Sequence, residues 1–181
     1  MVPEPARTGD CVPKAYDFLE QGEELEINMY GEVVEDIPID WWTGERVSGM
    51  YICEKDFLDD LGKYQGKSRI TVRINSVGGD LYAGLAIANR LKEMDAEIVT
   101  IADALVASAA VAIYQAGNTR KIFSGSQIMI HEPSCFIYGR YDLHALDKVQ
   151  KQLEAGKKSL INSYAQRTGR TEEDLENPLS G

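Results

Sequence analysis

The chain has 181 residues, which is enough for one domain with a sizeable hydrophobic core. Hydrophobic residues make up 44% of it, charged residues 27%, and the formal net charge is −10. Such an acidic chain lacks the basic surface typical of nucleic-acid-binding proteins and is repelled by anionic membranes, so the composition argues against both kinds of partner.

The N-terminal stretch, residues 1–20, is rich in proline, and we expect a flexible arm there, followed by one domain over residues 21–181. The stretch has no apolar core like that of a signal peptide. The longest apolar run, Ala104–Tyr114, is too short to span a bilayer. We therefore expect a cytoplasmic protein.

Hydrophobic periodicity predicts strands that alternate with helices along the remaining chain. The expected strands are Leu25–Gly31, Ser68–Asn75, Ala96–Asp103, Arg120–Ser124 and Gln127–His131, and the expected helices lie at 50–64, 81–91, 108–118 and 143–164. Strands that alternate with helices of this length indicate an α/β fold with parallel pairing. No internal repeat or second domain is evident.

Three further segments have a recognisable local pattern. Residues 35–49 read as a loop, in which Trp41 and Trp42 either pin the loop to the domain or form a docking surface. The apolar stripe of the long helix at 143–164 suits either a lid on the sheet or subunit contacts. Gly169 would end that helix, and Thr171–Asp174 resembles a capping box that opens another.

The cysteines, Cys11, Cys53 and Cys135, are odd in number and lack CxxC spacing. Neither a disulfide framework nor a zinc site is indicated, and we expect reduced thiols. No motif suggests a metal or an organic cofactor.

The pair Gly78-Gly79, between an expected strand and an expected helix, allows three interpretations. It can be a tight turn, because glycine adopts positive φ at low cost. It can cradle a phosphate, although neither GxGxxG nor GxxxxGK[ST] is present. It can also offer a bare backbone N–H to a developing oxyanion, as acyl-transfer enzymes need.

The oxyanion interpretation needs a nucleophile and a base. Ser108 lies in an alanine-rich segment, where serine commonly serves as a small packing residue or a helix N-cap. His131 ends an expected strand, where sheet-based enzymes place functional side chains, whereas His144 lies on the polar side of the long helix. Neither Ser108 nor His131 identifies a catalytic site by itself.

Taken together, however, the motifs resemble one family. The stretches "INSVGG" (Ile74–Gly79), "VASAAVAIYQAG" (Val106–Gly117) and "IMIHEP" (Ile128–Pro133) are similar to those of the Clp-type serine peptidases, the proteolytic subunit of the ATP-dependent Clp protease and its phage relatives. The resemblance extends over about Leu25–Leu175 and includes "YAQRTGRTEEDL". The form "VASAAV" and the stretch "YGEV" look closest to the phage branch, which includes head-maturation proteases.

The resemblance implies a single-domain Clp peptidase/crotonase-like fold built of repeated β-β-α units. It implies a serine endopeptidase with Ser108 as nucleophile, His131 as general base and the backbone N–H groups of Gly79 and Ala109 as oxyanion hole. Gly78 and Pro133 would lie beside a polypeptide substrate. No cofactor is needed, and the family assembles into homo-oligomeric rings, typically heptamers that stack. A side chain at residue 79 is expected to crowd the substrate carbonyl.

The family's third catalytic residue is an aspartate, which by spacing would fall near Ser180 or just beyond Gly181, where no acid stands. Asp174 and Glu176 come earlier and are expected to belong to the preceding helix. We therefore expect either a chain that lacks the family's C-terminal end or an incomplete triad. A weakly active or inactive assembly protein is one alternative function, and a crotonase-like enzyme acting on acyl thioesters is another. The N-terminus does not match the segment with which family members dock an ATPase, so that partner stays open.

Overall fold

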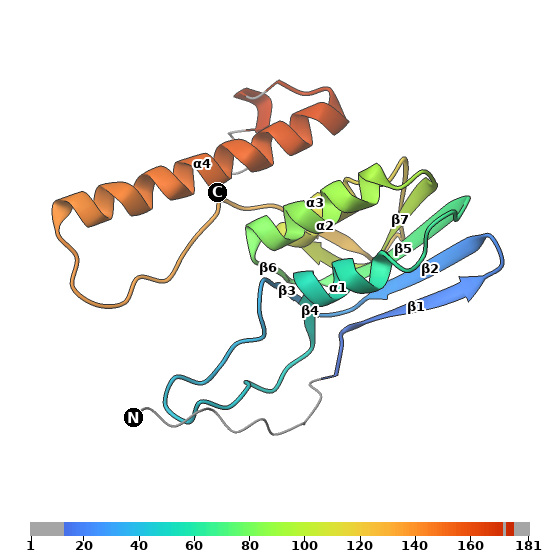
Figure 1. The fold of residues 1–181 in the computed structure, drawn as a ribbon. Helices are drawn as coiled ribbons and strands as arrows, with labels where there is room; N and C mark the ends of the chain where they lie inside the picture. The colour runs from blue at the N-terminus through green and yellow to red at the C-terminus, as the bar shows by residue number, and fades with distance from the viewer. Residues whose placement is uncertain (1–12, 172, 176–181) are drawn as a thin grey trace.

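The larger of two sheets carries most of the fold in this computed structural model, which describes residues 13–171 and 173–175 (Figure 1). It has six strands in the order β1-β2-β5-β7-β8, with β9 also paired to β7. The strands are β1 (Tyr16–Gln21), β2 (Glu24–Met29), β5 (Arg69–Ser76), β7 (Glu97–Ala107), β8 (Thr119–Ile122) and β9 (Gln127–Met129). Only β1 and β2 pair antiparallel; the other named pairs of this sheet are parallel.

A smaller sheet stands beside the carboxyl end of β5. Its strands are β4 (Tyr51–Cys53), β3 (Glu32–Val34) and β6 (Gly78–Gly79), in that order and all parallel. The two glycines are therefore a short strand, and β3 is its pairing partner. This pairing brings residues 32–33 next to the glycine pair.

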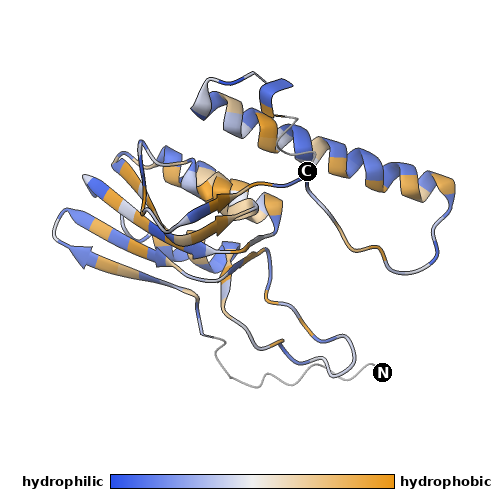
Figure 2. Cartoon of the chain, turned by 180° about the vertical axis from the view of Figure 1, so that it is seen from behind, coloured by the Kyte–Doolittle hydropathy of each residue, from blue (hydrophilic) through white to orange (hydrophobic). Residues whose placement is uncertain are grey.

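Helices α1 (Glu54–Leu61), α2 (Leu81–Glu93) and α3 (Ala109–Tyr114) lie on the same side of the larger sheet (Figure 1). Alternate residues of β5, namely Ile70, Val72 and Ile74, are fully buried toward them. In Figure 2 the hydrophobic segments gather where α2 and α3 meet the sheet. Burial of these aliphatic side chains is the main stabilising contribution to the fold.

Helix α4 (Leu143–Thr168) has two different halves. Its buried residues, Leu160 and Tyr164 among them, belong to the C-terminal half, whereas Leu143 is 87% exposed at the other end. Figure 1 shows that the N-terminal half, together with the loop that leads into it, extends past the sheets and helices α1–α3. Gly169 ends the helix in the left-handed conformation, as the sequence predicts.

The fold confirms the α/β class, the parallel pairing and the predicted order of elements. The expected arm over residues 1–20 needs correction at its end, where Tyr16–Gln21 forms β1 because it pairs along β2. The expected helix at 50–64 begins later, at Glu54, because Tyr51–Cys53 pairs with β3 as β4. Among the described helices, none combines the length and apolar character needed to cross a membrane.

Candidate active site

Ser108 stands at the carboxyl end of β7, one residue before α3. Its backbone has φ +53° and ψ −125°, and among the described residues it is the only non-glycine with positive φ. That conformation costs about 1–3 kcal/mol for a residue with a side chain, and such strain clusters at functional sites. The hydroxyl caps no N–H of α3, so the N-cap interpretation does not explain this serine.

His131 is brought to the same edge of the sheet by main-chain pairing. Because β9 runs parallel to β7, their carboxyl ends lie together, with Ala107 opposite Met129. The Ser108 N–H then donates to the Met129 carbonyl, at an N–O distance of 2.9 Å. His131 follows two residues later. The main-chain pairing of β7 with β9 thus places both candidate catalytic residues at the same edge of the sheet. No hydrogen bond joins the side chains of Ser108 and His131.

Ser108 and His131 line one cavity of about 590 Å³. Gly79 and Pro133 line it too, so the structure brings together four of the predicted site residues. Part of the stripe on α4 forms another wall, through Val149, Gln152, Leu153, Gly156 and Leu160. The charged side chains on this lining are the carboxylates of Glu32 and Asp80, together with the ionisable His131.

The other two predicted site residues lie behind the cavity rather than on it. A Cβ atom added to Gly78 would be 2.5 Å from the Ala107 carbonyl oxygen and 2.9 Å from the Ala109 nitrogen. Ala109 is 2% exposed and begins α3, and the first N–H groups of a helix have no intrahelical acceptor. The Ala109 N–H is therefore the candidate donor to a reacting carbonyl.

The conformation of the glycine pair has a reason within the fold itself. Gly78 and Gly79 have φ of +90° and +138°, values that side chains disfavour. A Cβ atom on Gly79 would lie 2.1 Å from the Val33 carbonyl oxygen of β3. The expectation that a side chain there would crowd the substrate carbonyl therefore needs correction, because it would first strike β3.

The imidazole of His131 has a single hydrogen-bond partner in the described part of the chain. Its Nδ1 lies 2.6 Å from the main-chain carbonyl oxygen of Glu132. The Glu132 carboxylate in turn bonds Lys157 of α4, at 2.5 Å. No carboxylate within the described residues bonds His131.

Asp174, an acid considered for the third catalytic position, has a different role. Its carboxylate accepts from the Thr171 N–H at 3.3 Å, and the Asp174 N–H donates to the Thr171 hydroxyl at 3.1 Å. This reciprocal pair is the predicted capping box. The Thr171 hydrogen bonds lower the pKa of Asp174. Glu176 and Ser180 lie outside the described residues.

Sequence reasoning missed several lining residues. Glu32 comes from β3 and Asp80 caps α2, where its carboxylate accepts from the Ala83 N–H at 2.8 Å. Cys135 lines the cavity as a free, exposed thiol; Cys53 is free and buried, and Cys11 lies outside the described residues. One feature of the sequence pointed to part of this lining. It was the apolar stripe of the long helix, which the lid interpretation places over the sheet.

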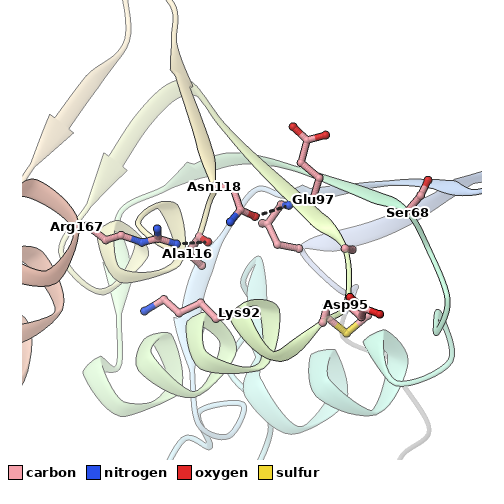
Figure 3. Close-up of a pocket in the computed structure, with 10 residues that line it drawn as sticks. Ser68, Lys92, Asp95, Glu97, Ala116, Asn118 and Arg167 are labelled. Carbon is pink, nitrogen blue, oxygen red and sulfur yellow. Dashed lines mark hydrogen bonds between the residues drawn. The ribbon is translucent and has the colours of Figure 1, made fainter.

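A second cavity, of about 390 Å³, lies near the opposite end of β7 (Figure 3). Arg167 of α4 enters it and donates to the carbonyls of Gln115 and Ala116, at 2.9 and 3.0 Å. Burial and the charge of Arg167 lower the pKa of Lys92. No histidine lines this cavity, so it is not the candidate for acyl transfer. Across the described residues, no group of three or more His, Cys, Asp or Glu side chains is arranged to hold a metal ion.

Comparisons with known proteins point to one family. The family model described as Clp protease matches residues 57–180. The ATP-dependent Clp protease proteolytic subunit 1 of Streptomyces avermitilis is 29% identical over 133 residues, covering 72% of this chain and 59% of that protein. The ATP-dependent Clp protease proteolytic subunit of Ligilactobacillus salivarius is 31% identical over 128 residues, covering 68% and 63%.

The same likeness holds for the fold. A ClpP1 mutant from Listeria monocytogenes superposes with a TM-score of 0.65 at 22% identity, over 85% of this chain and 78% of that one. The matched region spans about 59–63% of the length of the two curated relatives.

Proposed function

Because this chain belongs to the Clp protease family, we propose that it is a serine endopeptidase with Ser108 as nucleophile and His131 as general base. The observation that carries the proposal is the strained backbone of Ser108 on the cavity that His131 and Gly79 also line. Strain on a nucleophile that projects from a strand end is commonly part of an acyl-transfer site.

The chemistry follows from these groups. Ser108 Oγ attacks the peptide carbonyl carbon while His131 Nε2 takes the hydroxyl proton, and the carbonyl oxygen becomes an oxyanion. The N–H groups of Gly79 and Ala109 stabilise that oxyanion. The C–N bond then breaks, and the leaving amine receives the proton from His131. Water, deprotonated by His131, releases the acyl group and restores Ser108.

The substrate class we propose is an unfolded or scaffold-like polypeptide, which would lie against Pro133 in the cavity under α4, with Gly78 supporting the site from behind the lining. Two carboxylates on the lining, from Glu32 and Asp80, make this cavity acidic. For the setting we propose capsid maturation in the cytoplasm of a phage-infected or prophage-carrying bacterium, supported by the form of "VASAAV" around Ser108. Capsid and scaffold genes beside the gene would support this setting, and other neighbours would count against it.

We also propose a homo-oligomer, with a heptameric ring or stacked heptamers as the arrangement. The support is the exposed apolar set on α4 and the segment before it: Leu143 at 87%, Phe136 at 89% and Tyr138 at 80% exposure. The two relatives are named as subunits of ATP-dependent proteases, and the proposal for this chain does not include an ATPase.

A weakly active or inactive assembly protein is the second candidate. It is favoured by one observation, that no carboxylate in the described residues bonds His131. A crotonase-like thioester enzyme would use the oxyanion hole but would not need Ser108 and His131 together.

A fluorophosphonate probe separates these functions, because it reacts with an activated serine. We expect the label on Ser108 and its loss in Ser108→Ala and His131→Ala. Ser134 lines the same cavity and provides the matched control, so Ser134→Ala should label normally. A label on Ser134 would refute the assignment of the nucleophile, and no label at all would favour the assembly protein.

A further inference from the structure

The hydrogen bond of His131 defines the tautomer of its ring. A carbonyl oxygen only accepts, so the 2.6 Å contact between Nδ1 and the Glu132 carbonyl requires a proton on Nδ1. In the neutral ring, Nε2 then carries the lone pair. Nε2 is the nitrogen that takes the serine proton in a catalytic triad, where a carboxylate holds the Nδ1 proton. Here a main-chain carbonyl holds it.

The residue that supplies this carbonyl is anchored to α4 through its side chain. The Glu132 carboxylate bonds Lys157 Nζ, and the two side chains are 47% and 28% exposed. One residue further on, Pro133 approaches the helix at Gly156, where an added Cβ would be 3.7 Å from Pro133 Cγ. The segment after His131 is thus held at two consecutive positions of one helix.

The cavity carboxylates do not take the same role. Asp80 accepts from the Ala83 N–H at the start of α2, and neither it nor Glu32 bonds a nitrogen of the imidazole. Among residues 13–171 and 173–175, the group that bonds the imidazole of His131 is therefore the main-chain carbonyl of Glu132.

We propose that Glu132 is the positioning residue for His131: its carbonyl fixes the Nδ1–H tautomer, and its ion pair with Lys157 fixes the carbonyl. The proposal rests on the proposed function only in taking His131 as the general base. It links the orientation of the base to α4, so that a change at Lys157, a residue outside the lining of the cavity, alters the reaction at Ser108.

The tautomer can be measured directly, because His131 and His144 are the only two histidines. In ¹⁵N-histidine-labelled protein, His144→Asn leaves one imidazole to observe. At a pH of about 9, where histidine is neutral, we expect His131 to carry its proton on Nδ1. A proton on Nε2 would overturn the proposal. This measurement needs no enzymatic activity.

The role of the ion pair is tested by the first-order rate of Ser108 acylation at saturating fluorophosphonate. Lys157→Met should slow acylation by about three- to fivefold, as expected for a partly exposed ion pair. Lys157→Arg should restore the rate, and so should the exchange Glu132→Lys with Lys157→Glu. Lys151→Met is the matched control, because it removes an ion pair with Asp147 elsewhere on α4 and should leave the rate unchanged.

The outcomes separate the two proposals. An Nδ1–H tautomer without acylation of Ser108 in any variant would sink the proposed function and leave the positioning role supported. Acylation of Ser108 with Lys157→Met as fast as Lys151→Met would sink the positioning role and leave the peptidase in place.

Discussion

Gly78 lies so close to Ser108 that a Cβ atom on residue 78 would be 2.7 Å from the Cβ of Ser108. Real Cβ atoms do not approach that closely, so position 78 requires a glycine next to the nucleophile position. The contact joins the segment after β5 to the segment after β7. It therefore ties the candidate oxyanion hole to the candidate nucleophile.

Gly78→Ala should destabilise the fold by about 3 kcal/mol or more, because it adds both a steric conflict and a disfavoured φ of +90°. Urea unfolding monitored by circular dichroism measures the change. Gly125→Ala is the control, since a Cβ there meets nothing within 4 Å, and it should change stability by less than about 0.5 kcal/mol. Equal stability of the two variants would contradict the packing described for Gly78.

Ser108→Ala and Ser108→Gly should both lose labelling and hydrolysis, yet differ in stability. Alanine keeps the strain of φ +53°, whereas glycine relieves it, so we expect the glycine variant to be more stable by about 1 kcal/mol. In the interior of a helix the opposite holds, because alanine is there more stabilising than glycine. Thermal unfolding of the two variants decides the point, and a more stable alanine variant would mean that Ser108 is unstrained.

Gly156 is one of the α4 residues that line the cavity, and it faces Leu81 and Pro133. Gly156→Ala places a Cβ 3.0 Å from the flexible end of Leu81 and should acylate at nearly the normal rate. Gly156→Phe fills the cavity and should slow acylation by at least about tenfold, because the substrate is displaced from Ser108. If the phenylalanine variant cleaves peptides as fast as the alanine variant, the substrate does not occupy this cavity.

Asp60 should make the fold sensitive to acid. Burial raises the pKa of Asp60, but hydrogen bonds from Lys14, Lys63 and Tyr16 outweigh it and lower the pKa to about 2. A lowered folded-state pKa gives stability that is present above the unfolded value of 3.8 and is lost as the pH falls toward 2.

The free energy of unfolding should therefore fall by up to about 2 kcal/mol between pH 4 and pH 2. The Asp60→Asn variant should not show this fall. Asp59→Asn changes the neighbouring, exposed acid of α1 and should behave like the unaltered chain. Unfolding free energies at several pH values test this, and identical slopes for both variants would rule out the role of Asp60.

Assembly should depend on the protruding half of α4. Leu143→Asp puts a charge on a side chain that is 87% exposed, so it should leave the fold intact but shift the protein toward the 20.1 kDa monomer. His144→Asp introduces the same charge on the next residue and serves as the control. Light scattering after gel filtration measures the mass. A chain that is monomeric before any substitution would refute the homo-oligomer.

Much of the fold could be predicted because local patterns and tertiary demands agree. The alternating residues of β5 and the spacing of α2 and α4 gave their elements to within a few residues. The prediction of an arm needs correction at Tyr16–Gln21. The pairing of this segment with β2 is a tertiary contact, which the proline-rich local sequence does not indicate.

The candidate site was predictable only in part, for a similar reason. Ser108, His131 and Gly79 come from motifs with known spacing, and the structure places all three on one cavity. Glu32 and Lys157 carry no local signal. Their relevance arises from β3 reaching the glycine pair and from α4 crossing the segment after His131, and neither contact is encoded near the residues themselves.

The pairing of β9 along β7 has a consequence for evolution and engineering. Residues 105–107 match residues 127–129 one to one, and this register alone brings Ser108 and His131 to the same edge. The connection between the two strands includes the turn at Phe123–Ser126, which is largely exposed. An insertion at Ser124-Gly125 would lengthen the sequence between the two residues without moving either in space. Distant relatives are therefore better sought by the order of the motifs and the strand pairing than by a fixed number of residues between serine and histidine, and this turn is a suitable place for a peptide tag.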